Sequence, residues 1–504
     1  MTTPPNIVVI MTDTQDIRLV SAYGARGADT PCLDRLAATG VRFERCYTTS
    51  PVCTPARAGL FTGLPPTLAG PYTNCLPLGE GVQHLGHRFR DLGYATGYAG
   101  KWHLDGHDYF GTGVCPEGWD PELWFDGRDY LDSIGPEATK LWRQGLWGVE
   151  ALRKHNVTSE FCWAHCVVDR CIEWLPTHQD KPFLMVASFD EPHAPFTCPP
   201  EYVEKYIDRD FDYGPGFNDT LDNKPLHHKL WSGGPLSTPM GAAHRAQYLG
   251  CNEYVDSQVG RLVEEIESRY PNTWIIYTSD HGDFMGARGL QGKGPAMYDE
   301  ITRVPLIVRG PGCAAGKVDP TVVQHMDVMP TLLRLVGAEV PESLVGNDLS
   351  AHFRGTAGAE PGEAMLEFNR FEVNHDGFGG FQPIRCLVQG HWKLVINLLT
   401  SDELYNLRDD PGELKNLIDS AEHVETRDRL HDRLLDRMNE VRDAWRGWAW
   451  ERRPWRSSKL RLSPWGGKCR PHPADTHKAE YRDYDTGSRT RGVHAEYTST
   501  DAAD

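Results

Sequence analysis

The segment from Ser50 to Gly63 carries the residues best suited to chemistry. Cys53 stands two residues before Pro55, which suits the first turn of a helix, and Arg57 follows one turn later. The free N–H groups and the dipole of a helix N-terminus favour an anion beside Cys53. The guanidinium of Arg57 can return to the same place as a bidentate partner for an oxyanion. The alternative is a buried cysteine near a helix start with an arginine on the surface.

Three aspartates stand just past apolar segments. The segments are 6–11, 183–189 and 274–278, and the aspartates that follow them are Asp13, Asp190 and Asp280. Short apolar runs of this kind are typical of buried parallel strands. Ligands gather at the carboxyl ends of the strands in such sheets. We therefore look for the chemistry where these three carboxylates lie.

The first 310 residues alternate between strand and helix patterns. Strands are expected at Asn6–Met11, Phe183–Phe189, Trp274–Thr278 and Val304–Val308, and helices at 31–39 and Arg245–Arg269. Pro31 after Thr30 opens the first helix and Gly40 closes it. This alternation predicts an α/β fold with a large central mixed, mostly parallel sheet and helices on both faces.

The pattern changes after about residue 380. Short antiparallel strands are expected at Ile384–Gln389, Trp392–Asn397 and Glu403–Tyr405, followed by a helix at Ala421–Arg442. Beyond Arg446 the chain is rich in Pro, Trp, Arg and Gly, with little periodicity. We predict a large catalytic α/β domain in residues 1–380, a smaller C-terminal α+β domain with a short antiparallel sheet in 381–445, and an extended Trp/Arg-rich tail in 446–504.

Bulk composition limits the classes of function. The 504 residues carry a formal net charge of −18, which argues against binding to nucleic acid or to an anionic membrane. No apolar run is long enough to span a bilayer, and the first residues lack the features of a secretory signal. The thirteen cysteines are odd in number and without framework spacing, which fits reduced thiols. We expect a cytoplasmic protein.

One stretch departs from the acidic average. Between Arg442 and Arg470 there are nine Lys or Arg and two Asp or Glu, interleaved with five tryptophans. Such a stretch either lies over an anionic substrate or forms a subunit or domain contact. Enrichment in Trp and Arg is typical of interfaces, so we favour the contact and expect a homo-oligomer.

The segment around Cys53 resembles the signature of the type I, formylglycine-dependent sulfatases of the alkaline-phosphatase-like superfamily. That signature is C-x-P-x-R followed by T-G, and Cys53, Pro55, Arg57 and Thr62-Gly63 occupy it here. The loop of the cysteine phosphatases has a longer spacing between Cys and Arg. The resemblance implies a sulfuric ester hydrolase whose cysteine is oxidised to formylglycine by a separate maturation enzyme.

Further blocks of that family follow in the family's order. Gly100–Leu104 matches G-K-W-H-L, 191–195 matches P-H-x-P, 279–282 matches S-D-H/N-G, Lys293 matches a second sulfate-binding lysine, Asn74 matches an asparagine near the substrate, and 403–413 resembles a hairpin of the second domain. Taken alone, a histidine or lysine of this kind is more often structural or solvated. Together and in order they favour a sulfatase.

The resemblance also implies a role for each residue. Catalysis is assigned to Cys53, Arg57, Lys101, His103, His193 and Lys293; substrate contacts to Asn74, Lys101, His193 and Lys293; and metal ligation to Asp13, Thr14, Cys53, Asp280 and His281. Hydrated formylglycine supplies the nucleophile, with Asp280 as the implied base. Lys101, Lys293, Arg57 and the metal hold the sulfate charge. His193 protonates the leaving oxygen, and His103 takes the proton of the second hydroxyl.

Two positions depart from the family pattern at the metal site. Many sulfatases begin the site with two adjacent aspartates, whereas this chain has Asp13-Thr14, and it ends with Asp280-His281 in place of Asp-Asn. Calcium prefers oxygen ligands, whereas imidazole suits manganese or zinc better. The resemblance places one divalent ion here, calcium first and manganese next. Thr14 either ligates weakly through its hydroxyl or is replaced by Gln15.

Other interpretations stay open. Phosphonate monoester and phosphodiester hydrolases share the fold and nucleophile but have hydroxyl residues in place of the G-K-W-H block, so Lys101 and His103 favour a sulfate monoester. A binding protein on a decayed sulfatase fold is the non-enzymatic alternative. We expect a small anionic sulfate ester as substrate, formed from a sugar or another small polar alcohol.

Three features have a plain interpretation beside a functional one. Cys162, His165, Cys166 and Cys171 have the look of a zinc knuckle, but no second ligand pair follows, so neighbours on a helix are favoured. The polar turn 126–128 either reaches the substrate or is a simple loop. Arg288 stands where many relatives have a histidine, and a substrate contact is the one role considered for it.

Overall fold

The structure is a computed structural model. It describes residues 4–25, 27–175, 181–231, 242–358, 361–371 and 381–456, together with the backbone of 481–482 and 489–490. Residues 1–458 form one compact unit and residues 459–504 a second one, in which β12 (Tyr481–Arg482) pairs with β13 (Arg489–Thr490). Most of the predicted tail 446–504 therefore lies outside the described residues.

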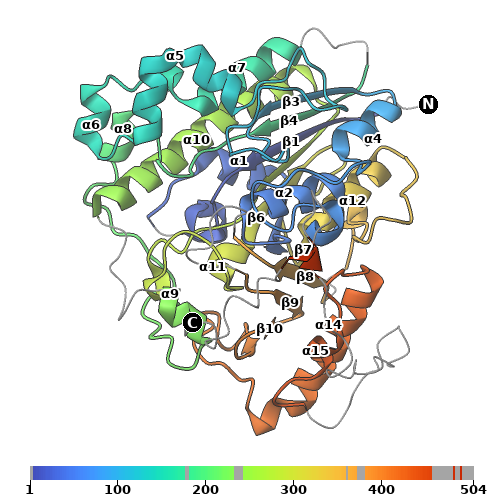
Figure 1. The fold of residues 1–504 in the computed structure, drawn as a ribbon. Coiled ribbons are helices and arrows are strands. Elements are labelled where there is room, and N and C mark those ends of the chain that lie inside the picture. Colours follow the sequence, from blue (N-terminus) through green and yellow to red (C-terminus); the bar gives the residue numbers. More distant parts are fainter. Residues whose placement is uncertain are drawn as a thin grey trace. The chain divides into compact units, whose positions relative to one another are not determined.

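The first unit is built on a mixed sheet of seven strands (Figure 1). Their order across the sheet is β3 (Ala95–Gly100), β4 (Phe183–Ser188), β1 (Asn6–Thr12), β5 (Thr273–Ser279), β6 (Arg303–Arg309), β2 (Val41–Tyr47) and β7 (Lys317–Gln324). Strand β6 runs antiparallel to both its neighbours, and every other pair is parallel. The predicted large, mostly parallel sheet is confirmed.

Helices cover both faces of this sheet because β1 is apolar on both sides. Val8 and Ile10 belong to the core shared with α1 (Pro31–Thr39), α7 (Trp163–Trp174) and α10 (Ala242–Arg269). Ile7 and Val9 belong to the opposite core, shared with α2 (Cys53–Thr62), α4 (Leu85–Asp91) and α12 (Val328–Leu335). Figure 1 shows the two groups of helices on either side of β1, β3 and β4.

The other α-helices in the described residues before residue 363 are short or peripheral. They are α3 (Pro66–Ala69), α5 (Gly127–Gln144), α6 (Val149–Lys154), α8 (Pro200–Glu204), α9 (Leu226–Trp231), α11 (Asp299–Thr302) and α13 (Ser350–Phe353). Asp126 caps α5, its carboxylate accepting the backbone N–H groups of Arg128 and Asp129, so the polar turn 126–128 begins a helix.

Strand register brings the polar strand ends to one edge. Thr12 lies opposite Ser279, and Met11 lies opposite Ser188. The next residues of β1 and β5 are Asp13 and Asp280, and Asp190 follows two residues after β4. The expected meeting of the three carboxylates therefore follows directly from the pairing of β1 with β4 and β5.

A second, four-stranded antiparallel sheet follows the first. Its order is β11 (Glu403–Asn406), β10 (Trp392–Asn397), β9 (Ile384–Gln389) and β8 (Glu363–Phe368). Apolar residues of this sheet pack against Leu430, Leu434 and Met438 of α14 (Val424–Glu440). The predicted short antiparallel sheet is confirmed, although its first strand lies before residue 380. The domain boundaries remain predictions.

The start of the Trp/Arg-rich stretch packs within its own chain. In and around α15 (Trp448–Glu451), Trp450 is buried and donates a hydrogen bond to the Trp445 carbonyl at 2.8 Å. Arg453 donates to both oxygens of Asp402 at 2.7 and 2.8 Å. The described residues of this stretch, up to 456, thus pack within their own chain, and the subunit or domain contact stays a prediction.

Two further observations bear on earlier expectations. None of the helices in the described ranges combines the length and apolarity required to cross a bilayer. All cysteines in the described part of the chain are free thiols. Helix α7 carries Cys166 and Cys171, with Cys162 as its N-cap residue, and burial raises the pKa of all three thiols. They are helical neighbours, as favoured.

Candidate active site

The side chain of Cys53 lies at the centre of the polar edge of the large sheet. It begins α2, and its Sγ lies 2.9 Å from Lys293 Nζ, 3.3 Å from His281 Nε2 and 4.0 Å from Asp13 Oδ1. Residue 53 is an unmodified cysteine here, so Sγ marks where the oxygens of a formylglycine hydrate would lie. Cys53 is buried, which keeps bulk water from these contacts.

The electrostatic surroundings of Cys53 favour a negative charge. Burial and the Asp13 carboxylate raise the pKa of the thiol, but Lys293, Lys101 and His281 outweigh them and lower it to about 6. An anion at this position is therefore stabilised mainly by Lys293 and Lys101, with a smaller contribution from His281 when its ring is protonated. The N-terminus of α2 adds a favourable dipole.

Arg57 links the two carboxylates at the ends of β1 and β5. Its Nε donates to Asp280 Oδ2 and one Nη donates to Asp13 Oδ2, both at 3.1 Å. The other Nη donates to the Lys101 carbonyl at 2.6 Å and to Ser188 Oγ at 2.8 Å. Arg57 is fully buried. The contacts observed are thus to protein groups, and a direct contact with sulfate stays a prediction.

Lys101 forms a buried ion pair with two carboxylates. Its Nζ lies 2.8 Å from Asp13 Oδ2 and 2.8 Å from Asp190 Oδ1, and 4.8 Å from the centre of the Tyr109 ring. Burial lowers the pKa of Lys101, but Asp13 and Asp190 raise it well above its usual value. The strand-end pattern pointed to Asp190, but neither Asp190 nor Tyr109 was assigned a role.

Four side chains form a cluster suited to one metal ion. Single ligand atoms of Asp13, Cys53, Asp280 and His281 all lie within 4.8 Å of one another, and all four residues are buried. His281 Nδ1 lies 2.9 Å from the Gly282 carbonyl, to which it donates, so Nε2 faces the cluster with its lone pair. Two carboxylates and an imidazole fit a divalent cation.

The two aspartates of this cluster differ in acidity. Burial raises the pKa of Asp280 to about 7, with a further increase from Asp13 that His281 and Arg57 oppose. Burial raises the pKa of Asp13 too, but Lys101 and Lys293 outweigh it and hold the pKa well below its usual range. Asp13 is therefore the more strongly anionic of the two carboxylates.

Thr14 and Gln15 have other partners. Thr14 adopts a left-handed backbone conformation with φ of 61°. Its hydroxyl donates to the Asp13 carbonyl at 2.7 Å and its N–H donates to Asp280 Oδ1 at 3.2 Å. Gln15 Nε2 donates to Asn252 Oδ1 at 2.6 Å. Thr14 thus braces the two aspartates through the backbone, and its role as a metal ligand remains a prediction.

Both predicted catalytic histidines lie near the charged side chains of Lys101, Lys293 and Asp13. Burial, assisted by Lys101, lowers the pKa of His103, whose Nε2 lies 3.8 Å from Cys75 Sγ. Burial and Lys101 likewise lower the pKa of His193. His193 Nδ1 lies 2.7 Å from the Ala194 carbonyl, and the His193 ring lies 5.7 Å from Tyr109. Both imidazoles are thus kept neutral in the absence of an anionic ligand.

Asn74 supports the start of α2. Its Oδ1 accepts the backbone N–H of Thr54 at 3.0 Å, and its own N–H donates to the Phe371 carbonyl at 3.1 Å. Asn74 thus lies beside residue 53, as a substrate contact would require, but the contacts observed hold α2 in place.

Arg288 is a buried structural residue. It has no exposed surface, and it donates to Asp219 Oδ2 at 2.5 Å and to the Gly412 carbonyl at 2.6 Å. Its guanidinium also lies over the Tyr298 ring at 3.9 Å. These contacts secure the loop that carries Lys293. The substrate contact considered for Arg288 is not supported.

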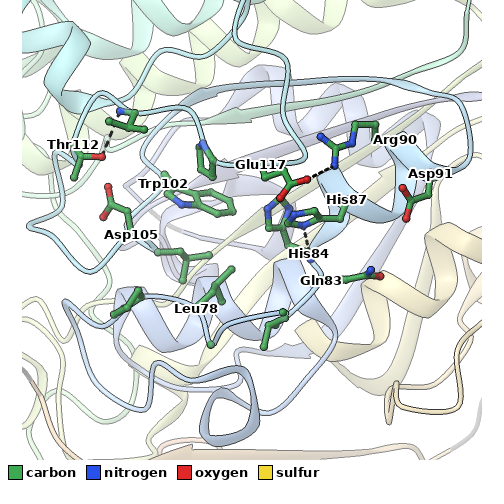
Figure 2. Close-up of a pocket in the computed structure, with 17 residues that line it drawn as sticks. Leu78, Gln83, His84, His87, Arg90, Asp91, Trp102, Asp105, Thr112 and Glu117 are labelled. Atoms are coloured by element: carbon green, nitrogen blue, oxygen red, sulfur yellow. Dashed lines mark hydrogen bonds and ion pairs between the residues drawn. The ribbon is translucent and has the colours of Figure 1, made fainter.

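A pocket of about 660 Å³ lies on the other side of the segment that carries Lys101 and His103. Trp102 and Leu104 line it, whereas Lys101 and His103 do not. Figure 2 shows Trp102 beside His84 and His87 of the α4 region. The side chains of 101–104 therefore alternate. Lys101 and His103 lie among the charged groups around Cys53, and Trp102 and Leu104 line this separate pocket.

The charges of the site identify the kind of ligand it binds. Arg57, Lys101 and Lys293 supply three cations, and Asp13, Asp190 and Asp280 supply three carboxylates. These charges cancel, so one divalent ion would leave two positive charges to attract an anion. A mixed α/β sheet with such a site at its edge fits an enzyme that acts on anionic esters with the help of a divalent ion.

The comparisons with known proteins identify the family. The sulfatase family model matches residues 5–338, and the model of the C-terminal part of N-sulphoglucosamine sulphohydrolase matches residues 289–440. The chain is 48% identical over 498 residues to the "uncharacterized sulfatase YidJ" of Escherichia coli K12, covering 98% of each. The protein belongs to the sulfatase family and is a sulfuric ester hydrolase.

Solved structures agree with the fold. A protein solved in complex with its substrate D-glucosamine-2-N,6-O-disulfate superposes with a TM-score of 0.73 at 20% identity, covering 88% of this chain and 99% of that one. The phosphonate monoester hydrolase of Agrobacterium radiobacter superposes with a TM-score of 0.71 at 25% identity, covering 86% and 96%. The expected family and fold class are confirmed.

Proposed function

We propose that the protein hydrolyses the sulfate monoester of a small polar alcohol, such as a sugar, through formylglycine at position 53. The observation that carries this proposal is the placement of Cys53 Sγ at the start of α2, in contact with Lys293 and His281 and near Asp13. A nucleophile at this point meets an anionic ester held by Lys101 and Lys293. The resemblance of the Cys53 segment to the sulfatase signature supports the modification.

The proposed metal site consists of Asp13, Asp280, His281 and residue 53, with Thr14 as a weaker fifth ligand. A divalent ion bound there supplies Lewis-acid polarisation of the sulfate and of the attacking hydroxyl. Calcium is the first choice because of the resemblance to the sulfatases, and manganese is the second because the imidazole of His281 suits manganese better than calcium.

The residues of the chain divide the proton transfers among them. Asp280 accepts the proton of the attacking hydroxyl of hydrated residue 53. Lys101 and Lys293 hold the charge on the sulfate oxygens, and Arg57 keeps the two aspartates in place. His193 donates a proton to the leaving oxygen once the bound anion raises its lowered pKa.

The second half of the cycle releases sulfate. His103 takes the proton of the second hydroxyl of residue 53, and the C–O bond to the sulfate breaks as the aldehyde forms. Water then adds to the aldehyde and restores the hydrate. Asn74 contacts the bound ester beside Thr54. Bulk water has limited access to the reacting groups because Cys53, Asp13 and Lys101 are all buried.

A phosphonate monoester hydrolase is the second candidate function. The Agrobacterium radiobacter enzyme of that name has the same fold. Lys101 and His103, which match the sulfatase block, favour a sulfate monoester over a phosphonate.

The remaining proposals concern partners and location. A formylglycine-generating enzyme is the implied maturation partner. The free thiols of the described cysteines support a reducing compartment, for which we propose the cytoplasm. We also propose that the chain assembles into a homo-oligomer.

Relative rates on two substrate classes test the proposal. Matured protein is assayed with an aryl sulfate and with an aryl phosphonate monoester that have the same leaving group, followed by a set of sulfated sugars. We expect a higher kcat/KM for the sulfate. A large preference for the phosphonate would reject the sulfatase assignment in favour of the second candidate, and no turnover of either by fully converted protein would favour a binding function.

A further inference from the structure

One ligand of the metal cluster changes its chemistry when the proposed maturation occurs. The unmodified Cys53 offers a thiolate sulfur, a soft donor that selects zinc. Formylglycine at the same position offers only oxygen, which is a hard donor. We infer that the unmodified chain is a zinc-binding protein, with Zn²⁺ held by Asp13, Cys53, Asp280 and His281. Conversion of Cys53 then shifts the preference of the site toward calcium or manganese, and this second part rests on the proposed function.

The distances between the four donors are close to, and slightly longer than, those of a tetrahedral zinc shell. Zinc–sulfur bonds of about 2.3 Å and zinc–nitrogen or zinc–oxygen bonds of about 2.0–2.2 Å place neighbouring ligand atoms roughly 3.3–3.6 Å apart. His281 Nε2 lies 3.3 Å from Cys53 Sγ, 3.6 Å from Asp280 Oδ1 and 3.8 Å from Asp13 Oδ1. Cys53 Sγ lies 4.0 Å from Asp13 Oδ1. These four distances exceed the zinc values by about 0.5 Å at most, and all pairs of donors lie within 4.8 Å of one another, so a modest contraction of the site gives zinc geometry.

Each donor is already held in a ligating orientation. His281 donates from Nδ1 to the Gly282 carbonyl, which leaves the lone pair of Nε2 facing the cluster. Arg57 binds the Oδ2 atoms of Asp13 and Asp280, which leaves their Oδ1 atoms on the side of Cys53 and His281. Such outer hydrogen bonds are typical of protein metal sites and reduce the ordering that binding requires.

The sulfur has a hydrogen-bond donor of its own. Lys293 Nζ lies 2.9 Å from Cys53 Sγ and 3.9 Å from Asp13 Oδ1, and it stabilises a thiolate at position 53. Asp280 Oδ1 also accepts two backbone N–H groups, from Thr14 at 3.2 Å and His281 at 2.8 Å, which fix its position. A site of one sulfur, one nitrogen and two oxygens, buried in protein, is a zinc site by donor type and by geometry.

His281 makes the effect specific to this chain. An asparagine at position 281 offers an oxygen, so a chain with asparagine there has sulfur as its single soft or borderline donor. The imidazole adds a second donor that zinc favours. The zinc affinity of the unmodified chain should therefore depend on both Cys53 and His281, and less strongly on either aspartate.

The experiment compares two preparations of the full chain. One is produced without a maturation enzyme and the other with it, and peptide mass identifies residue 53 in each. Zn²⁺ affinity is measured by competition with a chelator. Co²⁺ serves as a spectroscopic probe, because a cobalt–thiolate bond gives a near-ultraviolet charge-transfer absorption that oxygen ligands do not. Metal-free thermal unfolding confirms that each variant is folded.

The variants separate this site from other thiols. Cys53→Ser should lower zinc affinity by about two orders of magnitude or more and abolish the charge-transfer absorption. His281→Asn should weaken zinc binding by roughly 10- to 100-fold but keep that absorption. Cys166→Ser is the matched control, because Cys166 belongs to the other Cys/His segment; it should leave both properties unchanged. Zinc should also slow alkylation of Cys53 in the unmodified chain.

The other outcomes separate failure of this inference from failure of the proposed function. Zinc affinity that is unaffected by Cys53→Ser, or a cobalt complex without the charge-transfer absorption, would show that the thiolate is not a ligand. Equal zinc affinity in the two preparations would overturn the proposed change in metal preference on conversion of Cys53. If matured protein hydrolyses sulfate esters while the unmodified chain binds zinc weakly, this inference alone fails. If Cys53 binds zinc but is never converted, the zinc site stands and the proposed formylglycine function fails.

Discussion

Replacing Lys101 by methionine separates the contribution of the buried charges to stability from their contribution to catalysis. Lys101 Nζ lies 2.8 Å from both Asp13 Oδ2 and Asp190 Oδ1, and all three side chains are buried. Methionine has a similar length and no charge, so the variant leaves two carboxylates without this cation. Removing one partner of a buried ion pair costs about 3–5 kcal/mol, whereas replacing both partners by neutral groups is often close to neutral.

Stability and activity should therefore respond differently to a second substitution. Lys101→Met alone should lower the free energy of unfolding by about 3 kcal/mol. This is the lower end of the range for a broken buried ion pair, because Arg57 still pairs with Asp13 at 3.1 Å. The double variant Lys101→Met/Asp190→Asn should recover most of that loss. Turnover in both variants should be roughly 100- to 1,000-fold lower than in the parent protein, because one donor to the sulfate charge is missing.

Urea unfolding and kcat/KM on an aryl sulfate, with matured protein, measure the two effects. Lys415→Met, at an exposed lysine, is the control and should change neither quantity. Turnover of Lys101→Met close to that of the parent would remove Lys101 from the catalytic site. Recovery of activity in the double variant would show that Lys101 acts only by neutralising Asp190.

Three further predictions follow from other contacts. Arg57→Lys cannot bridge the two aspartates, so metal affinity should fall by about 10- to 100-fold in a metal titration, and an unchanged affinity would refute the bridge. Burial and the Asp190 charge raise the pKa of Glu191 from 4.5 to about 8, so the folded chain keeps a proton that the unfolded chain loses. The free energy of unfolding should then decrease by about 1.4 kcal/mol per pH unit as the pH rises between these two values. In urea unfolding, Glu191→Gln should abolish this decrease, and an equal slope in both proteins would contradict the reasoning. Arg453→Ala leaves Asp402 buried without its bidentate partner and should lower the free energy of unfolding by about 3 kcal/mol with kcat unchanged, whereas a large loss of kcat would place this segment in the catalytic site.

Much of the fold is visible in local patterns. The strands β1, β4, β5 and β6 are apolar runs that end in polar residues, and α10 shows a continuous apolar stripe. Strand β3 has no such signal, because its sequence Ala-Thr-Gly-Tyr-Ala-Gly is rich in small residues. It is a strand because it pairs with β4 at the edge of the sheet. Strand β8 was likewise found only through its pairing with β9.

The same limit applies to the site. Cys53, Lys101 and His281 stand in family blocks that the sequence shows directly. The ion pair of Lys101 with Asp190 and the ring of Tyr109 beside it depend on distances between segments that are far apart in the chain. The role of Arg57 differs for the same reason. Its spacing from Cys53 indicates an anion partner, but the fold brings Asp13 and Asp280 within reach, and they take its donors.

The central claim is that an aldehyde hydrate at position 53 does the chemistry. The direct test is the mass of the peptide that contains residue 53, measured on samples produced with graded amounts of the maturation enzyme and compared with their turnover of an aryl sulfate. Turnover should rise in proportion to the fraction of chains with the aldehyde and should be lost in Cys53→Ala. Full turnover in a sample whose residue 53 is entirely unmodified cysteine would contradict the account.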